Sequence, residues 1–197
     1  MNTEKKAVSP ILAALREGTA QAHRDLESGL SLGHAGLTLP DYIRTLQLFH
    51  AFVTEWENIG EQHCPEAFRE FFAGRRRAAL LEEDLRFFSA AALEAHPSLS
   101  HLRTSASFWG AMYVMEGSTL GGQVISRQLE TNLGFSNRNG YSYFYGHGSE
   151  TGNKWREFVS VLTAESASLP ENEIVDGARA QFEAFRVFFA AAAPAVA

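Results

Sequence analysis

Apolar residues recur along this chain at intervals of three and four positions, and segments that alternate between apolar and polar residues over the length of a strand are hard to find. Intervals of three and four place side chains on one face of an α-helix. The pattern therefore predicts an all-α fold in which each helix buries one apolar face against its neighbours.

The first half of the chain carries clear signals for the beginnings of helices. Ser9 followed by Pro10 is typical of an N-cap with proline in the first turn, and it predicts a helix over 10–28. The stretch Thr38-Leu-Pro-Asp41 resembles a capping box and predicts a second helix that runs to about residue 60. Two shorter helices are expected over 65–72 and 76–91.

The second half predicts a long helix, an ordered loop and two final helices. The helical pattern over 99–133 is interrupted only by a cluster of glycines, where we expect a kink because small residues leave the turn poorly supported. Residues 134–153 are rich in Gly, Asn, Ser and Tyr, which indicates a loop, and its aromatic side chains argue that the loop is ordered. Helices are expected over 154–168 and 171–192, the second with Phe182, Phe185, Phe188 and Phe189 on its inner side.

Composition indicates one domain over 1–197, flexible at 1–8 and 193–197, because 197 residues with 45% hydrophobic content build one substantial core. A net charge of −6 argues against nucleic acid as a partner. The single cysteine, Cys64, excludes an intrachain disulfide and a cysteine metal cluster, and it favours a reducing compartment. The N-terminal residues lack the apolar core of a signal peptide, and no segment approaches about 18 uncharged apolar residues. We therefore expect a cytoplasmic protein that does not enter a membrane.

The glycine cluster is the first indication of function. Gly117, Gly121 and Gly122 fall inside a helical pattern, where each glycine costs about 1 kcal/mol relative to alanine. Gly117 and Gly121 are one turn apart, so together they strip one helix face of side chains. A large flat ligand could lie directly against such a face. The alternatives are a close helix–helix contact through small residues and a simple helix end.

His23 in the first helix offers a ligand for a metal in such a group. Arg16 lies seven residues before it, on nearly the same face and about 10.5 Å away along the axis, a distance comparable to that from a haem iron to its propionate edge. Glu27, four residues after His23, could accept a hydrogen bond from the imidazole nitrogen that does not face the iron. The alternative is an exposed polar face, and for His50, which lies among apolar residues, a structural role is favoured. A histidine opposite a bare helix face indicates a haem sandwich.

Three stretches that span nearly the whole chain, in this order, resemble the haem oxygenase family. They are Leu15-Arg-x-x-Thr-x-x-x-His23-x-x-x-Glu27, Gly117-Ser-Thr-Leu-Gly-Gly122 and Phe144-Tyr-Gly-x-Gly-x-x-Thr-Gly-x-x-Trp155-x-x-Phe158. The similarity is greatest to the bacterial enzymes that make biliverdin for bacteriophytochromes. It implies a helical bundle in which haem b, substrate and cofactor at once, lies between a proximal N-terminal helix and a kinked, glycine-rich distal helix.

The resemblance also implies the reaction and its partners. Haem would be opened oxidatively to biliverdin, carbon monoxide and ferrous iron with dioxygen and electrons from outside. A ferredoxin or a flavoprotein reductase is the expected electron donor, and a bacteriophytochrome is a candidate acceptor of biliverdin.

Residue roles follow from the same resemblance. His23 matches the proximal iron ligand, and Arg16 matches a basic residue that pairs with a propionate. Ser118 stands where many animal enzymes have an aspartate that organises water near bound oxygen, so its hydroxyl is a candidate for proton delivery. The catalytic side is expected to consist of Gly117, Ser118 and Gly121, and the haem contacts to include Thr19, Glu27, Tyr113, Gly122 and Arg156 as well.

Other classes of protein stay open on the residues alone. A haem carrier or sensor could use the same pocket without turnover. Thiaminase-like enzymes of the wider fold need a cysteine nucleophile, but Cys64 precedes Pro65 at a predicted helix boundary and is read as an incidental thiol. Di-iron oxidases need carboxylate and histidine clusters, and the chain has no Glu-x-x-His. A helical interaction module would leave the clustered glycines unexplained.

The run Arg75-Arg-Arg77 is the only group of three consecutive basic residues in this acidic chain. One hypothesis is that it docks an acidic electron donor. A solvated helix start is the alternative, because surface charge runs usually have no further role.

Overall fold

The structure is a computed structural model that describes residues 9–30, 32 and 36–191, and over this part of the chain it contains helices, turns and loops but no strand. The all-α prediction is confirmed. Its α-helices are α1 (Pro10–Gly29), α2 (Leu39–His63), α3 (Arg69–Ala73), α4 (Ala78–Phe87), α5 (Ser105–Leu133), α6 (Ser142–Tyr145), α7 (Thr151–Glu165) and α8 (Glu171–Ala191). Short 3₁₀ turns occupy Glu66–Phe68, Gly148–Glu150 and Ser166–Ser168.

Both predicted helix starts are confirmed. The Ser9 hydroxyl accepts a hydrogen bond from the Leu12 amide at 3.4 Å, and the Thr38 hydroxyl accepts one from the Asp41 amide at 3.3 Å. The second helix continues three residues beyond Gly60, where the prediction ended it. Gly60 is buried, and a Cβ there would lie 2.9 Å from the Phe72 ring, so this glycine makes room for packing and does not end the helix.

The three predicted helices between residues 65 and 133 have other bounds in the structure. The expected helix over 65–72 is a 3₁₀ turn followed by the short α3, and the one over 76–91 is shortened to α4, after which Ser89 has a φ of 53°. The long helix begins at Ser105 and not at 99, with the Thr104 hydroxyl as its N-cap. Leu99 and Leu102 lie in the non-helical segment before it, and both are buried. Their spacing of three residues resembles that of a helix because both side chains face the core.

Residues 134–153, which were expected to be a loop, contain α6 and a 3₁₀ turn, and α7 begins at Thr151. The short α6 is fixed by a buried carboxylate on another helix. Asp84 on α4 accepts hydrogen bonds from the Ser142 amide at 2.7 Å and the Tyr143 amide at 2.9 Å. Tyr143 and Phe144 are buried, as an ordered segment requires.

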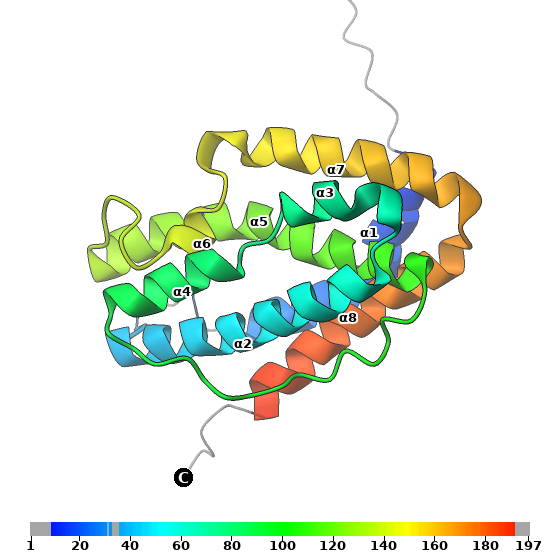
Figure 1. The fold of residues 1–197 in the computed structure, drawn as a ribbon. Helices are drawn as coiled ribbons and strands as arrows, with labels where there is room; N and C mark the ends of the chain where they lie inside the picture. Colours follow the sequence, from blue (N-terminus) through cyan, green and yellow to red (C-terminus); the bar gives the residue numbers. More distant parts are fainter. Residues whose placement is uncertain (1–8, 31, 33–35, 192–197) are drawn as a thin grey trace, which may run out of the picture.

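Helix α5 runs through the middle of the molecule, with α7 on one side and α2 and α8 on the other (Figure 1). Where it crosses α8, glycines on both helices let the two backbones come into direct contact. A Cβ on Gly110 would lie 2.1 Å from the Ile174 carbonyl oxygen, and one on Gly177 would lie 2.6 Å from the Ser107 Cα. Helix α5 is continuous through its later glycines, and the kink expected there stays a prediction.

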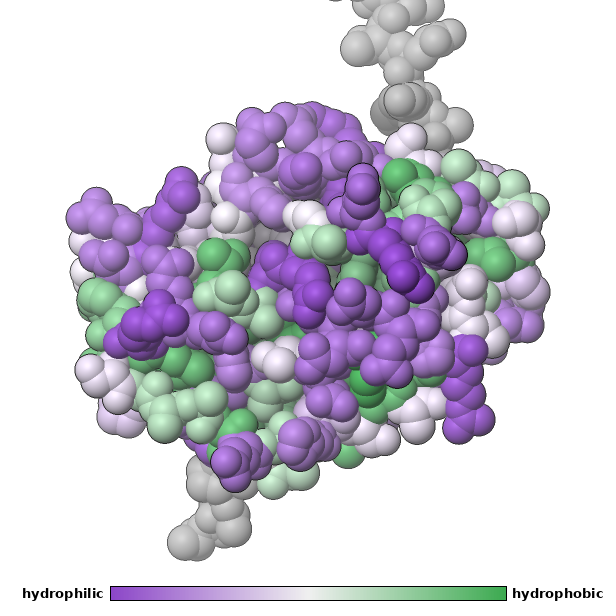
Figure 2. Space-filling model, in the orientation of Figure 1, coloured by the Kyte–Doolittle hydropathy of each residue, from purple (hydrophilic) through white to green (hydrophobic). Residues whose placement is uncertain are grey.

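Aromatic side chains of α8 and α2 build the core beside α5. Phe182 and Phe185 are each 5% exposed, as the predicted inner side of α8 requires, whereas Phe188 and Phe189 are partly buried. The centroids of the Phe185 ring and of the Phe52 ring on α2 are 4.2 Å apart. The surface over α7 is mainly hydrophilic (Figure 2). No helix in the part of the chain that the structure describes is long and apolar enough to span a membrane.

Candidate active site

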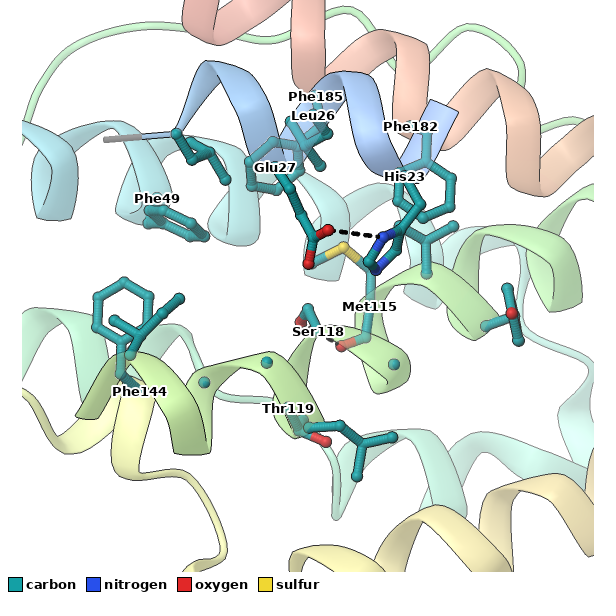
Figure 3. A pocket seen from close by; sticks show the side chains of 18 of the residues that line it. His23, Leu26, Glu27, Phe49, Met115, Ser118, Thr119, Phe144, Phe182 and Phe185 are labelled. Atoms are coloured by element: carbon teal, nitrogen blue, oxygen red, sulfur yellow. Dashed lines mark hydrogen bonds and ion pairs between the residues drawn. The ribbon is translucent and has the colours of Figure 1, made fainter. Parts of the chain in front are cut away.

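A cavity of about 420 Å³ lies between α1 and α5, and its volume is within the range typical of small-molecule sites. Helices α2, α6, α7 and α8 contribute further wall residues, most of them apolar or aromatic (Figure 3). Eight of the ten residues expected at the site line this cavity: Arg16, His23, Glu27, Tyr113, Gly117, Ser118, Gly121 and Gly122.

His23 projects from α1 toward α5 (Figure 3). Its Nδ1 lies 3.3 Å from a carboxylate oxygen of Glu27, one turn later on the same helix, and its ring packs edge-on against Phe182 with centroids 5.7 Å apart. The side chain is 56% exposed because it faces the open cavity. The contact to Glu27 engages one ring nitrogen and leaves Nε2 as the nitrogen available to a ligand.

The three clustered glycines of α5, Gly117, Gly121 and Gly122, serve different purposes. A Cβ on Gly121 would meet nothing within 4 Å, and one on Gly117 would only come within ordinary contact distance of Trp155, at 3.8 Å. These two positions leave open space against the backbone. A Cβ on Gly122 would lie 2.8 Å from the Phe144 carbonyl oxygen, so this glycine lets α6 approach α5 closely. The wall over Gly117 and Gly121 is therefore free of side chains.

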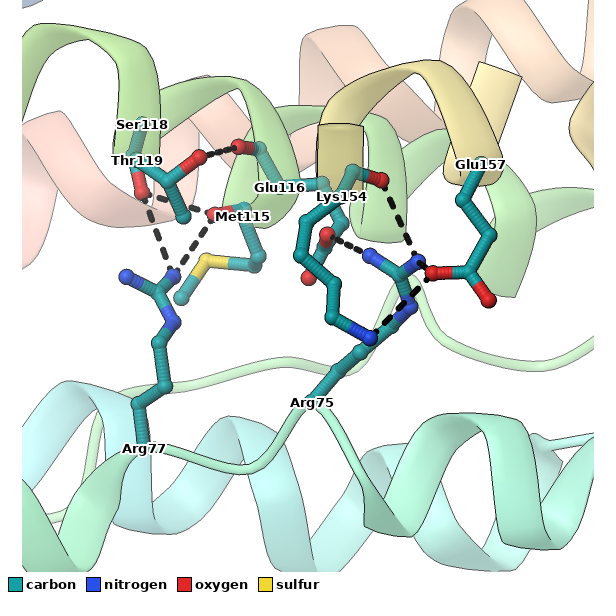
Figure 4. Close-up of polar contacts among 8 residues, drawn as sticks. All are labelled: Arg75, Arg77, Met115, Glu116, Ser118, Thr119, Lys154 and Glu157. Atoms are coloured by element: carbon teal, nitrogen blue, oxygen red, sulfur yellow. Dashed lines mark hydrogen bonds and ion pairs between the residues drawn. The ribbon is translucent and has the colours of Figure 1, made fainter. Parts of the chain in front are cut away.

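Ser118 is engaged by the protein itself. Its hydroxyl donates a hydrogen bond to the Met115 carbonyl at 2.7 Å, and the Arg77 guanidinium approaches the same hydroxyl at 3.5 Å (Figure 4). Arg77 also donates to the Met115 carbonyl at 2.8 Å and lies 4.9 Å from the centre of the Tyr143 ring. A buried cation and a tyrosine therefore stand beside Ser118 in the cavity wall.

The Arg75-Arg-Arg77 run is not a basic surface, so the docking hypothesis was wrong for two of its three residues, as was the alternative of a solvated helix start. The Arg75 side chain is 3% exposed and pairs with buried Glu116 and, at 2.9 Å, with Glu157 (Figure 4). Arg77 is 5% exposed. Burial raises the pKa of Glu116, and the charges of Arg77 and Arg75 oppose that rise.

Arg76 is the member of the run that reaches solvent, with 36% of its side chain exposed. It pairs with Glu57 at 3.3 Å and with Glu61 at 3.0 Å, so acidic side chains surround it. These two carboxylates largely neutralise the positive charge of Arg76, which the docking hypothesis needed for binding an acidic electron donor.

At the Arg16 end of the cavity, burial raises the pKa of the Tyr113 hydroxyl, and the side chains of Thr19 and Arg16 lower it in turn. Thr19 is buried behind the wall, does not line the cavity, and donates to the Leu15 carbonyl at 2.7 Å.

Arg156 does not line the cavity. It is exposed on α7 and donates to the Asn153 side chain, whereas Trp155, one residue earlier, faces the cavity. Trp155 belongs to the motif quoted above, so the sequence contained a signal for it, but Phe49, Arg77 and Tyr143 had none that was specific to the cavity.

The chain is similar to one family of known proteins. The model of the family described as "Heme oxygenase" matches residues 9–191. A curated heme oxygenase of Xanthomonas campestris pv. campestris (strain 8004) is 28% identical over 165 residues, which cover 83% of this chain and 97% of that protein.

Solved structures have the same fold. The NO- and CO-bound heme oxygenase of Neisseria meningitidis superposes with a TM-score of 0.72 at 22% identity, over 96% of each chain. Heme oxygenase 2 of Chlamydomonas reinhardtii without heme gives a TM-score of 0.81 at 15% identity, over 95% of this chain and 100% of that one. The family match over almost the whole chain, together with a histidine facing a bare helix across a cavity, shows that this protein belongs to the haem oxygenase family and is an enzyme of that kind.

Proposed function

We propose that this enzyme binds haem b through His23 and opens it to biliverdin, carbon monoxide and ferrous iron, with dioxygen and electrons supplied from outside. The observation that carries the proposal is the placement of the His23 ring opposite Gly117 and Gly121, whose missing side chains leave a flat space in the cavity. When bound, haem supplies the iron that takes up dioxygen and the meso carbon that is oxidised.

The protein orients and encloses this substrate. The Glu27 carboxylate lies 3.3 Å from Nδ1 of His23, which favours the tautomer with its proton on Nδ1 and leaves Nε2 for the iron. Phe182 holds the ring from the side. The apolar wall excludes water from most of the macrocycle, and the bare face lets the α5 backbone crowd the oxygen-binding side. No strong acid of α5 reaches that side, since Ser118 stands there in place of a carboxylate.

Arg16 is proposed to hold a propionate. It lines the cavity at the Tyr113 end, and its guanidinium is exposed, as a group that meets a carboxylate at the cavity edge should be. Arg156, which we expected to hold the other propionate, lies outside the cavity wall, so we propose Arg16 as the main clamp.

The partners proposed for the reaction are a ferredoxin or flavoprotein reductase as electron donor and a bacteriophytochrome as acceptor of biliverdin. Both proposals are supported by the resemblance of the motifs in the first, fifth and seventh helices. The buried Arg75 and Arg77 give no support to a docking site at that run.

The test is a spectroscopic assay of turnover. Purified protein is mixed with hemin, a reductant is added in air, and the visible spectrum is followed. We expect the Soret band to decay into biliverdin absorption. A Soret band that persists through reduction would overturn the reaction and leave a carrier or sensor.

His23 is tested by His23→Ala, with His96→Ala as a control at a histidine whose side chain is 87% exposed. We expect His23→Ala to lose the normal axial ligation and turnover, and added imidazole to restore both. Normal ligand spectra in this variant would refute the assignment.

A further inference from the structure

The inference concerns the apolar end of the cavity, and it rests on the proposed function. Helix α1 contributes Arg16 at one end of the cavity wall and Leu30 at the other. Phe49 and Phe144 lie on the far side of Glu27 from His23, toward the Leu30 end (Figure 3). With Arg16 at the propionate edge of haem, these two rings face the opposite, apolar edge.

Phe49 on α2 and Phe144 on α6 close this end as a pair. Both line the cavity and both are buried. Their ring centroids are 5.2 Å apart, and the rings meet edge to face, a favoured arrangement of aromatic side chains. The position of Phe144 therefore decides how much room the apolar edge of haem has.

Helix α6, which carries Phe144, has little in its own sequence to fix its place. It contains four residues, Ser142–Tyr145, and no side chain of the preceding residue caps it. A helix of one turn does not persist without contacts to the rest of the protein. One such contact comes from α5, where Gly122 lets the α6 backbone approach closely.

The other contact comes from α4, through the carboxylate of Asp84. One carboxylate oxygen accepts a hydrogen bond from the Ser142 amide at 2.7 Å, and the other accepts one from the Tyr143 amide at 2.9 Å. Both amides belong to the first turn of α6, where backbone N–H groups have no partner inside the helix. Asp84 therefore caps α6 from a distant part of the chain, as a local N-cap residue would do.

This cap has a cost for the fold. Asp84 is completely buried, and burial raises its pKa to about 6, a rise that the two amides of α6 oppose. At neutral pH the protein thus holds an ionised carboxylate away from water, which is less stable than a neutral side chain of the same shape. A residue that lowers global stability and fixes one short helix in a cavity wall is typical of a functional constraint.

We propose that Asp84 controls how haem is seated: by holding α6 it keeps Phe144 against the apolar edge of the ring and so limits rotation of the ring about the His23–iron axis. Asp84 does not line the cavity, so it is a positioning residue that acts through Phe144. Arg16 restrains the same rotation from the polar edge. Together the two ends determine which meso carbon is oxidised.

The first experiment tests the cap in the haem-free protein by amide hydrogen exchange. Asp84→Asn keeps the shape of the side chain but leaves one acceptor oxygen for two amides, and it should fold because it removes the buried charge. Exchange at Ser142 or Tyr143 should become about tenfold faster, the change that the loss of one hydrogen bond of ordinary strength produces. Glu83→Gln removes the same charge at the adjacent, exposed position and should exchange like the wild type. Wild-type exchange at both amides of Asp84→Asn would overturn the inference.

The second experiment measures the seating of haem without turnover. Proton NMR of the ferric complex resolves the methyl groups of the ring, and their shifts depend on the rotation of the ring relative to the axial imidazole. We expect these shifts to change and hemin affinity to fall in Asp84→Asn, and both to stay as in the wild type in Glu83→Gln. Unchanged methyl shifts together with faster exchange would mean that Asp84 serves the fold alone, and would overturn the inference.

The products separate this inference from the proposed function. Chromatography should show a biliverdin isomer ratio in Asp84→Asn that differs from the wild-type ratio, and the wild-type ratio in Glu83→Gln. An unchanged ratio in Asp84→Asn would refute its role in the choice of meso carbon. A wild-type protein that binds haem without degrading it would instead refute the proposed function, while the exchange rates and methyl shifts would still decide whether Asp84 seats haem.

Discussion

Replacing Gly122 by alanine tests whether this glycine exists for helix contact, and Gly121→Ala is its matched control. The two positions are adjacent on α5 and gain the same methyl group. At Gly122 the new Cβ would lie 2.8 Å from the Phe144 carbonyl oxygen and 3.5 Å from the Phe144 Cα, whereas at Gly121 it would meet nothing within 4 Å. Backbone atoms cannot swing aside as a side chain does, so α5 and α6 have to separate in Gly122→Ala.

The expected magnitudes follow from two effects. Both substitutions remove a glycine from a helix interior, which stabilises the helix by about 1 kcal/mol. Only Gly122→Ala adds an overpacking cost, about 1–3 kcal/mol for one extra methyl group in a packed contact. The two variants should therefore differ in stability by about 1–3 kcal/mol, or roughly 2–12 °C in Tm for a chain of this size. Gly121→Ala should be slightly more stable than the wild type.

The assay is thermal and urea unfolding of the haem-free proteins, followed by titration with hemin. Separation of α6 from α5 also moves Tyr143 and Phe144, so Gly122→Ala should bind hemin more weakly as well. Equal stability of the two variants would refute the close approach of α6, and with it the division of the glycines into two kinds.

Local signals in the sequence were enough for the helices and for one face of the cavity. The caps at Ser9 and Thr38 depend on side chains within three residues, so they could be read without the fold. The same holds for Gly117 and Gly121, whose one-turn spacing alone predicts a bare stripe, and for the pair of His23 and Glu27.

Contacts between distant segments could not be read in this way. The sequence shows three similar glycines over 117–122, and only the approach of Phe144, twenty-two residues away from Gly122, distinguishes the third. Likewise, Arg75 and Arg77 look like surface charge, because the carboxylates that bury Arg75 come from Glu116 and Glu157 on other helices.

Three further predictions follow from the site and its support. Gly117→Leu should keep the haem-free fold but lose most hemin binding, because its side chain fills the open space over α5; a Soret titration equal to that of the wild type would count against the bare face. Arg16→Ala should change the biliverdin isomer ratio with a modest loss of affinity, since an energy difference of about 1.4 kcal/mol between haem orientations changes their ratio tenfold, whereas chromatography of the Arg156→Ala products should show the wild-type ratio. Burial raises the pKa of Asp84 from its usual 3.8 to about 6, so the folded protein holds a proton there that the unfolded chain has already released. The stability that this proton contributes is present below pH 4 and is lost as pH rises through 6, by about 3 kcal/mol in all. Urea unfolding between pH 4 and 7 should therefore show a steeper fall in stability for the wild type than for Asp84→Asn, which cannot titrate, and parallel curves would show that the two backbone amides at Asp84 hold its pKa near the usual value.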